Sequence, residues 1–123
     1  MTRRFYIPLK KSRYRIKVLI FENRKKLNEY VKRKRWFPRE VEAFCHCDCN
    51  AGDTYSTILV YEGGFGVGLV AHETLHALLF YVCRILKMKQ TWMSTGRYAS
   101  PQEEFLCDLM HETTVGFWKR YSR

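Results

Sequence analysis

The chain lacks a hydrophobic segment long enough to cross a bilayer, which requires roughly 20 consecutive apolar residues. Residues 66–86 come closest, but two histidines, a glutamate and an arginine interrupt them. The N-terminus has two arginines and only a short apolar patch broken by Pro8, so it does not predict a secretory signal. We therefore expect a cytoplasmic protein with no membrane partner.

The sequence also lacks the even set of cysteines that a disulfide framework needs. Its five cysteines, without a secretory signal, argue against such a framework. Three of them alternate with polar residues in Cys45-His46-Cys47-Asp48-Cys49, which on a strand places the thiols on one side. The C-x2-C spacing of structural zinc sites is missing, so a buried cysteine face is the preferred interpretation. A second metal site or a redox role for this strand stays open.

Acidic residues are scarce in the first third of the chain. Residues 1–40 hold 15 Lys/Arg and 3 Asp/Glu, a net charge of +12, whereas residues 41–123 carry −2 of the total of +10. Such a basic block is typical of a solvated face, but it also suits nucleic acid or an acidic protein as a partner. Tyr30, Trp36 and Phe37 lie among its cations, where they could stack on single strands or pack a helix on a sheet.

Length and pattern predict one α+β domain over residues 1–123. We expect a small three-stranded sheet packed with helices, since strand-like and helix-like patterns alternate along the chain. Asn23 is the expected N-cap of the first helix, and Ser100 with Glu103 forms a capping box for the last one. The predicted strands are residues 14–21, 41–49 and 56–61, and the predicted helices are about 24–34, 67–86 and 101–119.

The most informative motif is His72-Glu73-Thr74-Leu75-His76, which reads H-E-x-x-H inside a helical pattern. Two histidines four residues apart point the same way on a helix and can hold one zinc ion. Glu73 then lies beside the open metal position, where it can take a proton from bound water. The alternative is a pair of satisfied histidines on a buried helix, but a glutamate among apolar neighbours is costly to bury without a role.

A catalytic zinc needs a third protein ligand, and Glu104 on the last helix is the candidate. The longer motif that continues to a third histidine is excluded, because Leu79 and Val82 occupy its glycine and histidine positions. Asp108 and His111 lie on the same face as Glu104 and could support the ligating histidines through hydrogen bonds, or be an ordinary solvated acid and a surface histidine. The apolar residues expected to pack inward are Phe105, Leu106, Leu109, Val115 and Trp118.

The segments G-L-V-A-H-E-T-L-H-A-L-L and E-E-F-L-C-D-L together resemble the small gluzincin-like zinc peptidases encoded by many phages and prophages. The resemblance covers roughly residues 55–120. It implies a minimal zincin-like architecture with zinc ligands His72, His76 and Glu104 and the base Glu73. It also implies the cytoplasm of a host cell, if a phage encodes the chain. The cysteine cluster and the basic first third depart from the pattern.

These residues predict a zinc-dependent metallopeptidase that cleaves a peptide or protein substrate. Glu73 would pass the water proton to the leaving amine, and Tyr98, ahead of His111 and Arg97, would stabilise the tetrahedral intermediate. The strand at residues 56–61 could bind an extended peptide as an added strand. The alternative is a basic accessory factor that binds nucleic acid or protein and keeps zinc only for structure, or holds only a vestigial site.

Overall fold

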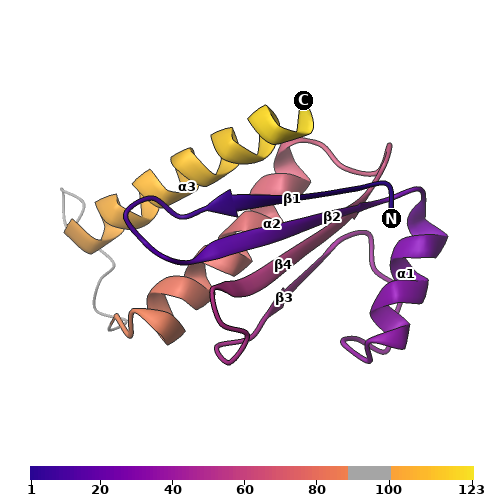
Figure 1. The fold of residues 1–123 in the computed structure, drawn as a ribbon, viewed down its shortest axis with the longest axis horizontal. Helices are drawn as coiled ribbons and strands as arrows, with labels where there is room; N and C mark the ends of the chain where they lie inside the picture. The colour runs from indigo at the N-terminus through magenta and orange to yellow at the C-terminus, as the bar shows by residue number, and fades with distance from the viewer. Residues whose placement is uncertain (89–100) are drawn as a thin grey trace.

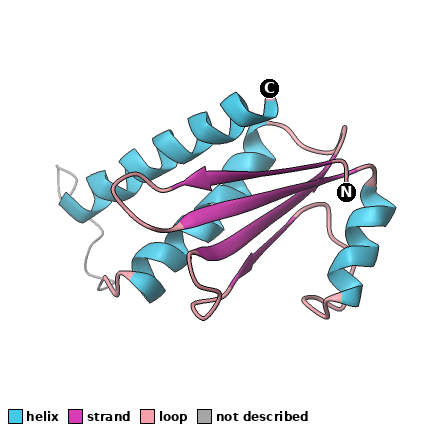
Figure 2. Cartoon of the chain, viewed as in Figure 1, coloured by secondary structure: helices cyan, strands magenta, loops and turns pink. Residues whose placement is uncertain are grey.

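A computed structural model describes residues 1–88 and 101–123, and within them the chain forms a mixed α+β fold on a four-stranded sheet (Figures 1 and 2). The strand order is β1-β2-β4-β3; β2 and β4 are parallel, and both outer pairs are antiparallel. The strands are β1 (Arg3–Pro8), β2 (Arg15–Phe21), β3 (Phe44–Cys47) and β4 (Thr54–Tyr61). The helices are α1 (Arg24–Arg33), α2 (Val67–Phe80) and α3 (Pro101–Tyr121), and the π-helical turn η1 (Tyr81–Ile85) continues α2.

Strand β1 corrects the prediction of a three-stranded sheet. It pairs residue by residue with β2, from Arg3 opposite Ile20 to Pro8 opposite Arg15. Its two arginines and its proline obscured the strand pattern in the sequence. Both are compatible with an edge strand, where one side needs no partner and proline can close the ladder.

Strand β4 lies inside the sheet, although the sequence suggested that it could bind a peptide. All residues from Tyr55 to Val60 are buried, which is typical of a strand that is covered on both faces. Over Ser56–Leu59 its hydrogen-bonding edges are taken by β2 on one side and β3 on the other. An added strand cannot pair there, and the sheet edge next to β4 belongs to β3.

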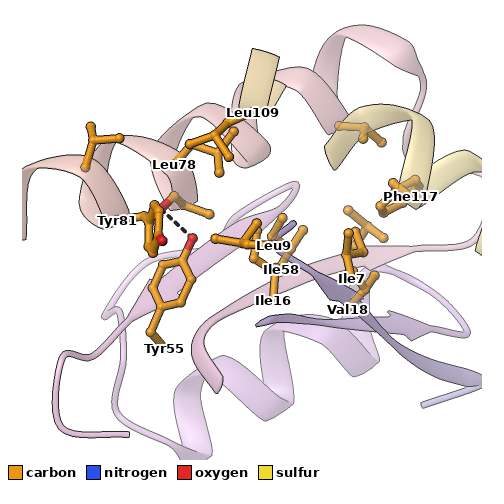
Figure 3. Close-up of a cluster of buried hydrophobic side chains, with 14 of the residues drawn as sticks. Ile7, Leu9, Ile16, Val18, Tyr55, Ile58, Leu78, Tyr81, Leu109 and Phe117 are labelled. Atoms are coloured by element: carbon orange, nitrogen blue, oxygen red, sulfur yellow. Dashed lines mark hydrogen bonds between the residues drawn. The ribbon is translucent and has the colours of Figure 1, made fainter. Parts of the chain in front are cut away.

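The two faces of the sheet carry different helices. Helices α2 and α3 cover one face and α1 lies on the other (Figure 3). The larger core lies under α2 and α3, where alternate residues of β1, β2 and β4 meet Leu78 and Phe117. Leu27 and Val31 of α1 cover the smaller core. The side chain of Asn23 accepts a hydrogen bond from the backbone N–H of Lys26 at 2.9 Å, so it caps α1 as predicted.

The face that helix α3 presents to the core matches the prediction in part, because Leu109 is buried and Leu106 and Trp118 pack against the core as expected. Phe105 and Val115 are 37% and 38% exposed, whereas Thr113 and Gly116 are buried. A Cβ on Gly116 would meet Ile7 Cγ2 at 3.0 Å, so the glycine lets α3 approach β1 closely. The hydrophobic pattern included two large residues that stay exposed and missed Thr113, Gly116 and Phe117, whose burial depends on how α3 docks on the sheet. No helix in residues 1–88 or 101–123 combines the length and apolar character that a membrane crossing needs.

Candidate metal and hydrolysis site

The two histidines of the motif converge at the surface of α2. His72 and His76 are both exposed, one helical turn apart, and their Nε2 atoms lie 3.2 Å apart. Two imidazole nitrogens bound to one tetrahedral zinc at about 2.0–2.1 Å would be separated by about 3.3 Å. The spacing therefore suits a shared metal ion. It also suits a single N–H···N hydrogen bond between the two rings, the alternative that sequence reasoning left open.

Glu73 lies beside these histidines on the inward side of α2. Its side chain is only 6% exposed. Burial raises the pKa of its carboxyl group, while the nearby His76 and His72 act in the opposite direction. A carboxylate with a raised pKa next to two imidazoles is a better proton acceptor than a solvated one, which suits a general base.

The cysteine strand faces this glutamate. Cys45 Sγ and Cys47 Sγ lie 3.7 Å apart, and Ser56 Oγ lies 3.3 Å and 3.5 Å from them. The hydrogen bond to Cys47, burial and the charge of Glu73 raise the pKa of the Cys45 thiol, and the same bond lowers that of Cys47. The inward thiols support the buried-face interpretation. However, β3 ends at Cys47 and Cys49 is exposed, so the predicted nine-residue strand was too long.

An open groove of about 410 Å³ runs along the exposed side of the motif. One wall is the chain leading into β3, residues 41–43, and the other comprises Gly68, Leu69, His72 and Glu73. Glu42 in the first wall is held by Tyr61 Oη at 2.6 Å and by Arg24 Nε at 2.7 Å. Sequence reasoning placed residues 41–43 in a strand and missed this wall. No local signal marks it, because only the packing of β3 beside α2 creates it.

The predicted partners on α3 do not gather around the two histidines. Glu104, Asp108 and His111 are all exposed. Asp108 instead borders a surface cavity of about 210 Å³ with Lys10 and Lys11 of the β1–β2 turn. In the described part of the chain, no three His, Cys, Asp or Glu side chains form a group that could hold a metal ion. Tyr98, Arg97 and the predicted cap residue Ser100 lie outside the described residues.

Comparison with known proteins adds no family assignment. No protein-family model, curated protein or solved structure matches this chain. The resemblance to gluzincin-like peptidases stays a prediction based on the motif residues. Any function must therefore be argued from the geometry of the site.

The raised pKa of Glu73 predicts how the stability of the metal-free protein depends on pH. A carboxyl group with a higher pKa in the folded state binds protons more tightly when folded, so its contribution to stability is lost as the pH rises. Metal-free Glu73→Gln should therefore have a higher free energy of unfolding than wild type at pH 7.5. The difference should shrink as the pH falls towards about 4. Urea unfolding at several pH values measures it, and a difference that grows at low pH would contradict the burial argument.

Proposed function

We propose that the chain is a zinc-dependent hydrolase, most specifically a metallopeptidase with a minimal zincin-like architecture. The observation that carries the proposal is the 3.2 Å separation of the exposed Nε2 atoms of His72 and His76. This separation is close to the distance between two nitrogen ligands of one tetrahedral zinc ion, and the buried Glu73 lies directly beside the two histidines. A zinc ion held there would act as a Lewis acid and bring the pKa of a bound water towards about 7.

The three chemically active residues of the motif on α2 then have distinct roles. His72 and His76 hold the ion through their Nε2 atoms. Glu73 accepts the proton of the attacking water and delivers it to the leaving amine, which its raised pKa favours. Tyr98 remains the proposed donor to the tetrahedral intermediate.

Glu104 remains the proposed third ligand, but it would need to approach from its exposed position in the first turn of α3. Asp108 borders the β1–β2 turn, so its proposed support of the histidines requires the same movement.

The groove beside the motif suggests how a peptide would bind. Within residues 1–88 and 101–123, strand β3 is paired with β4 along one edge only, so its other edge can pair with an extended chain. Such a chain would lie beside residues 41–43 and pass His72 and Glu73. The proposed peptide therefore pairs with β3 instead of β4.

Zinc binding is the first test of the proposal. Wild-type protein should bind one zinc ion, and saturating zinc at 100 times its Kd should stabilise the fold by about 2.7 kcal/mol. The His76→Ala variant should lose both effects because it removes one of the two imidazoles. The matched control is His46→Ala, a histidine of β3 whose ring stacks on Trp36, which should leave zinc binding unchanged. Titration calorimetry and thermal unfolding in chelator-treated buffer measure both quantities.

Two further variants test the third ligand in the same experiment. Glu104→Ala should weaken zinc binding, whereas Glu112→Ala, an exposed carboxylate two turns along the same helix, should not. Equal affinity in both would remove Glu104 from the site and leave the two histidines. Unchanged zinc binding by His76→Ala would reject the site altogether.

A further inference from the structure

A groove with a strong positive charge lies on the opposite side of the sheet from the motif helix. It has a volume of about 370 Å³ and runs between α1 and the outer face of β1 and β2. Arg4 and Lys17 line it from the strands, and Lys26 and Arg33 line it from the helix. The register of β1 and β2 explains why Arg4 and Lys17 reach the groove. Arg4 lies opposite Leu19 and Tyr6 lies opposite Lys17, and all four are on the face of the sheet that α1 only partly covers.

The cations of this groove are poorly neutralised by the protein. Among the described residues, the ion pairs include none of Arg4, Lys17 and Arg33. The one carboxylate in its lining, Glu29, lies 4.0 Å from Lys26. By contrast, Arg24 on the same helix is paired with Glu40 at 3.2 Å and Glu42 at 2.7 Å. Like charges around one hollow repel one another, so the groove favours an anionic ligand.

The aromatic rings near the groove are already in contact with other groups. The Arg15 guanidinium lies 4.0 Å from the ring centroid of Tyr6, and Arg33 lies 5.3 Å from that of Tyr30. Trp36, which the sequence offered for base stacking, stacks on His46 at 3.9 Å with the rings nearly parallel. These contacts occupy one face of each ring, so the cations are the main chemistry that the groove itself supplies.

The groove offers little of the apolar surface of a protein interface. Leu19 and Phe21 line it, yet each is only 3% exposed, so Met1 and the half-buried Tyr30 are the accessible apolar side chains of the lining. Protein partners gain most of their affinity from clusters of buried apolar and aromatic anchors, whereas four cations outnumber these two side chains here. Phosphate backbones need only an array of cations.

We propose that this groove binds the phosphate backbone of a nucleic-acid strand, with little preference for base sequence. Arg4 and Lys17 contact the strand from the sheet, and Lys26 and Arg33 contact it from α1. Helices α1 and α2 cover opposite faces of the sheet (Figure 3). A strand bound between α1 and the sheet therefore leaves the groove beside His72 open. The inference is independent of the proposed hydrolase activity.

Two pairs of substitutions on α1 test the proposal with matched spacing. Lys26→Gln with Arg33→Gln removes two groove cations seven residues apart. Lys25→Gln with Lys32→Gln removes two exposed cations with the same spacing, which line a separate hollow with Glu40. The probe is a fluorescently labelled single-stranded DNA of 20 mixed nucleotides, with binding followed by anisotropy at several salt concentrations. Thermal unfolding shows that each variant is folded.

The groove pair should weaken binding roughly tenfold at low salt and reduce the slope of log K against log salt by roughly 1.4. The control pair should change affinity by less than about threefold, because its charges lie outside the groove. Arg4→Gln with Lys17→Gln should reproduce the loss from the opposite wall. If both double variants on α1 lose the same amount of DNA affinity, the effect depends only on net charge and the proposal is overturned. Absence of binding at low salt would also overturn it, as would a polyglutamate probe that binds more tightly than the DNA.

Discussion

Glu73→Gln is expected to lower the rate of peptide hydrolysis by roughly 10²–10⁴-fold, the usual contribution of a general base. Glutamine is nearly the same size as glutamate but cannot accept the water proton at neutral pH. The buried position of Glu73 makes the loss hard to compensate, because bulk water cannot easily replace a base that is only 6% exposed. Zinc binding should persist, since His72 and His76 are unchanged.

The measurement uses a pool of unstructured peptides with mass-spectrometric detection of cleavage, and calorimetry for zinc. Glu112→Gln is the control, because this exposed glutamate on α3 undergoes the same chemical change and is paired with Lys10 of the β1–β2 turn. Cleavage that survives at wild-type rates in Glu73→Gln would show that this carboxylate is not the base. A variant that loses both cleavage and zinc would instead assign Glu73 to metal binding.

Phe117→Ala should have the largest effect on stability, with a loss of about 3–5 kcal/mol. Phe117 is fully buried, where α3 meets the sheet and the start of α2. Its ring centroid lies 5.5 Å from that of Phe5 and 5.8 Å from that of Phe65. Alanine would remove these contacts and leave a cavity that the surrounding strands cannot close.

Such a loss is a large part of the roughly 5–15 kcal/mol that stabilises an ordinary domain. Urea unfolding measures it. Phe105→Ala on the same helix is the control, because Phe105 is 37% exposed and its replacement should cost well under half as much. Equal losses at the two positions would mean that α3 is oriented as the hydrophobic pattern alone suggested.

Much of the site was accessible from the sequence because its determinants are local. The H-E-x-x-H spacing places His72 and His76 on one face of any helix, and the structure sets their Nε2 atoms 3.2 Å apart. Asn23 capped its helix as predicted, because a cap depends on residues only three positions apart.

Other features depend on contacts between distant segments. The groove wall at residues 41–43 exists because β3 joins the sheet beside α2. The interior position of β4 follows from the pairing of β2 with it across more than 30 intervening residues, which no local pattern encodes. Glu104 was chosen for its spacing along α3, but its distance from α2 depends on how the two helices dock.

The sequence by itself determined that two imidazoles and a carboxylate share one helical turn, since helix periodicity fixes neighbours within a few residues. It also determined the excess of cations in the first 40 residues. Only the tertiary structure decided that four of those cations surround one groove, and that the ring of Trp36 stacks on that of His46. The physical reason is that packing and charge balance depend on which distant surfaces meet, and that is settled by the whole fold.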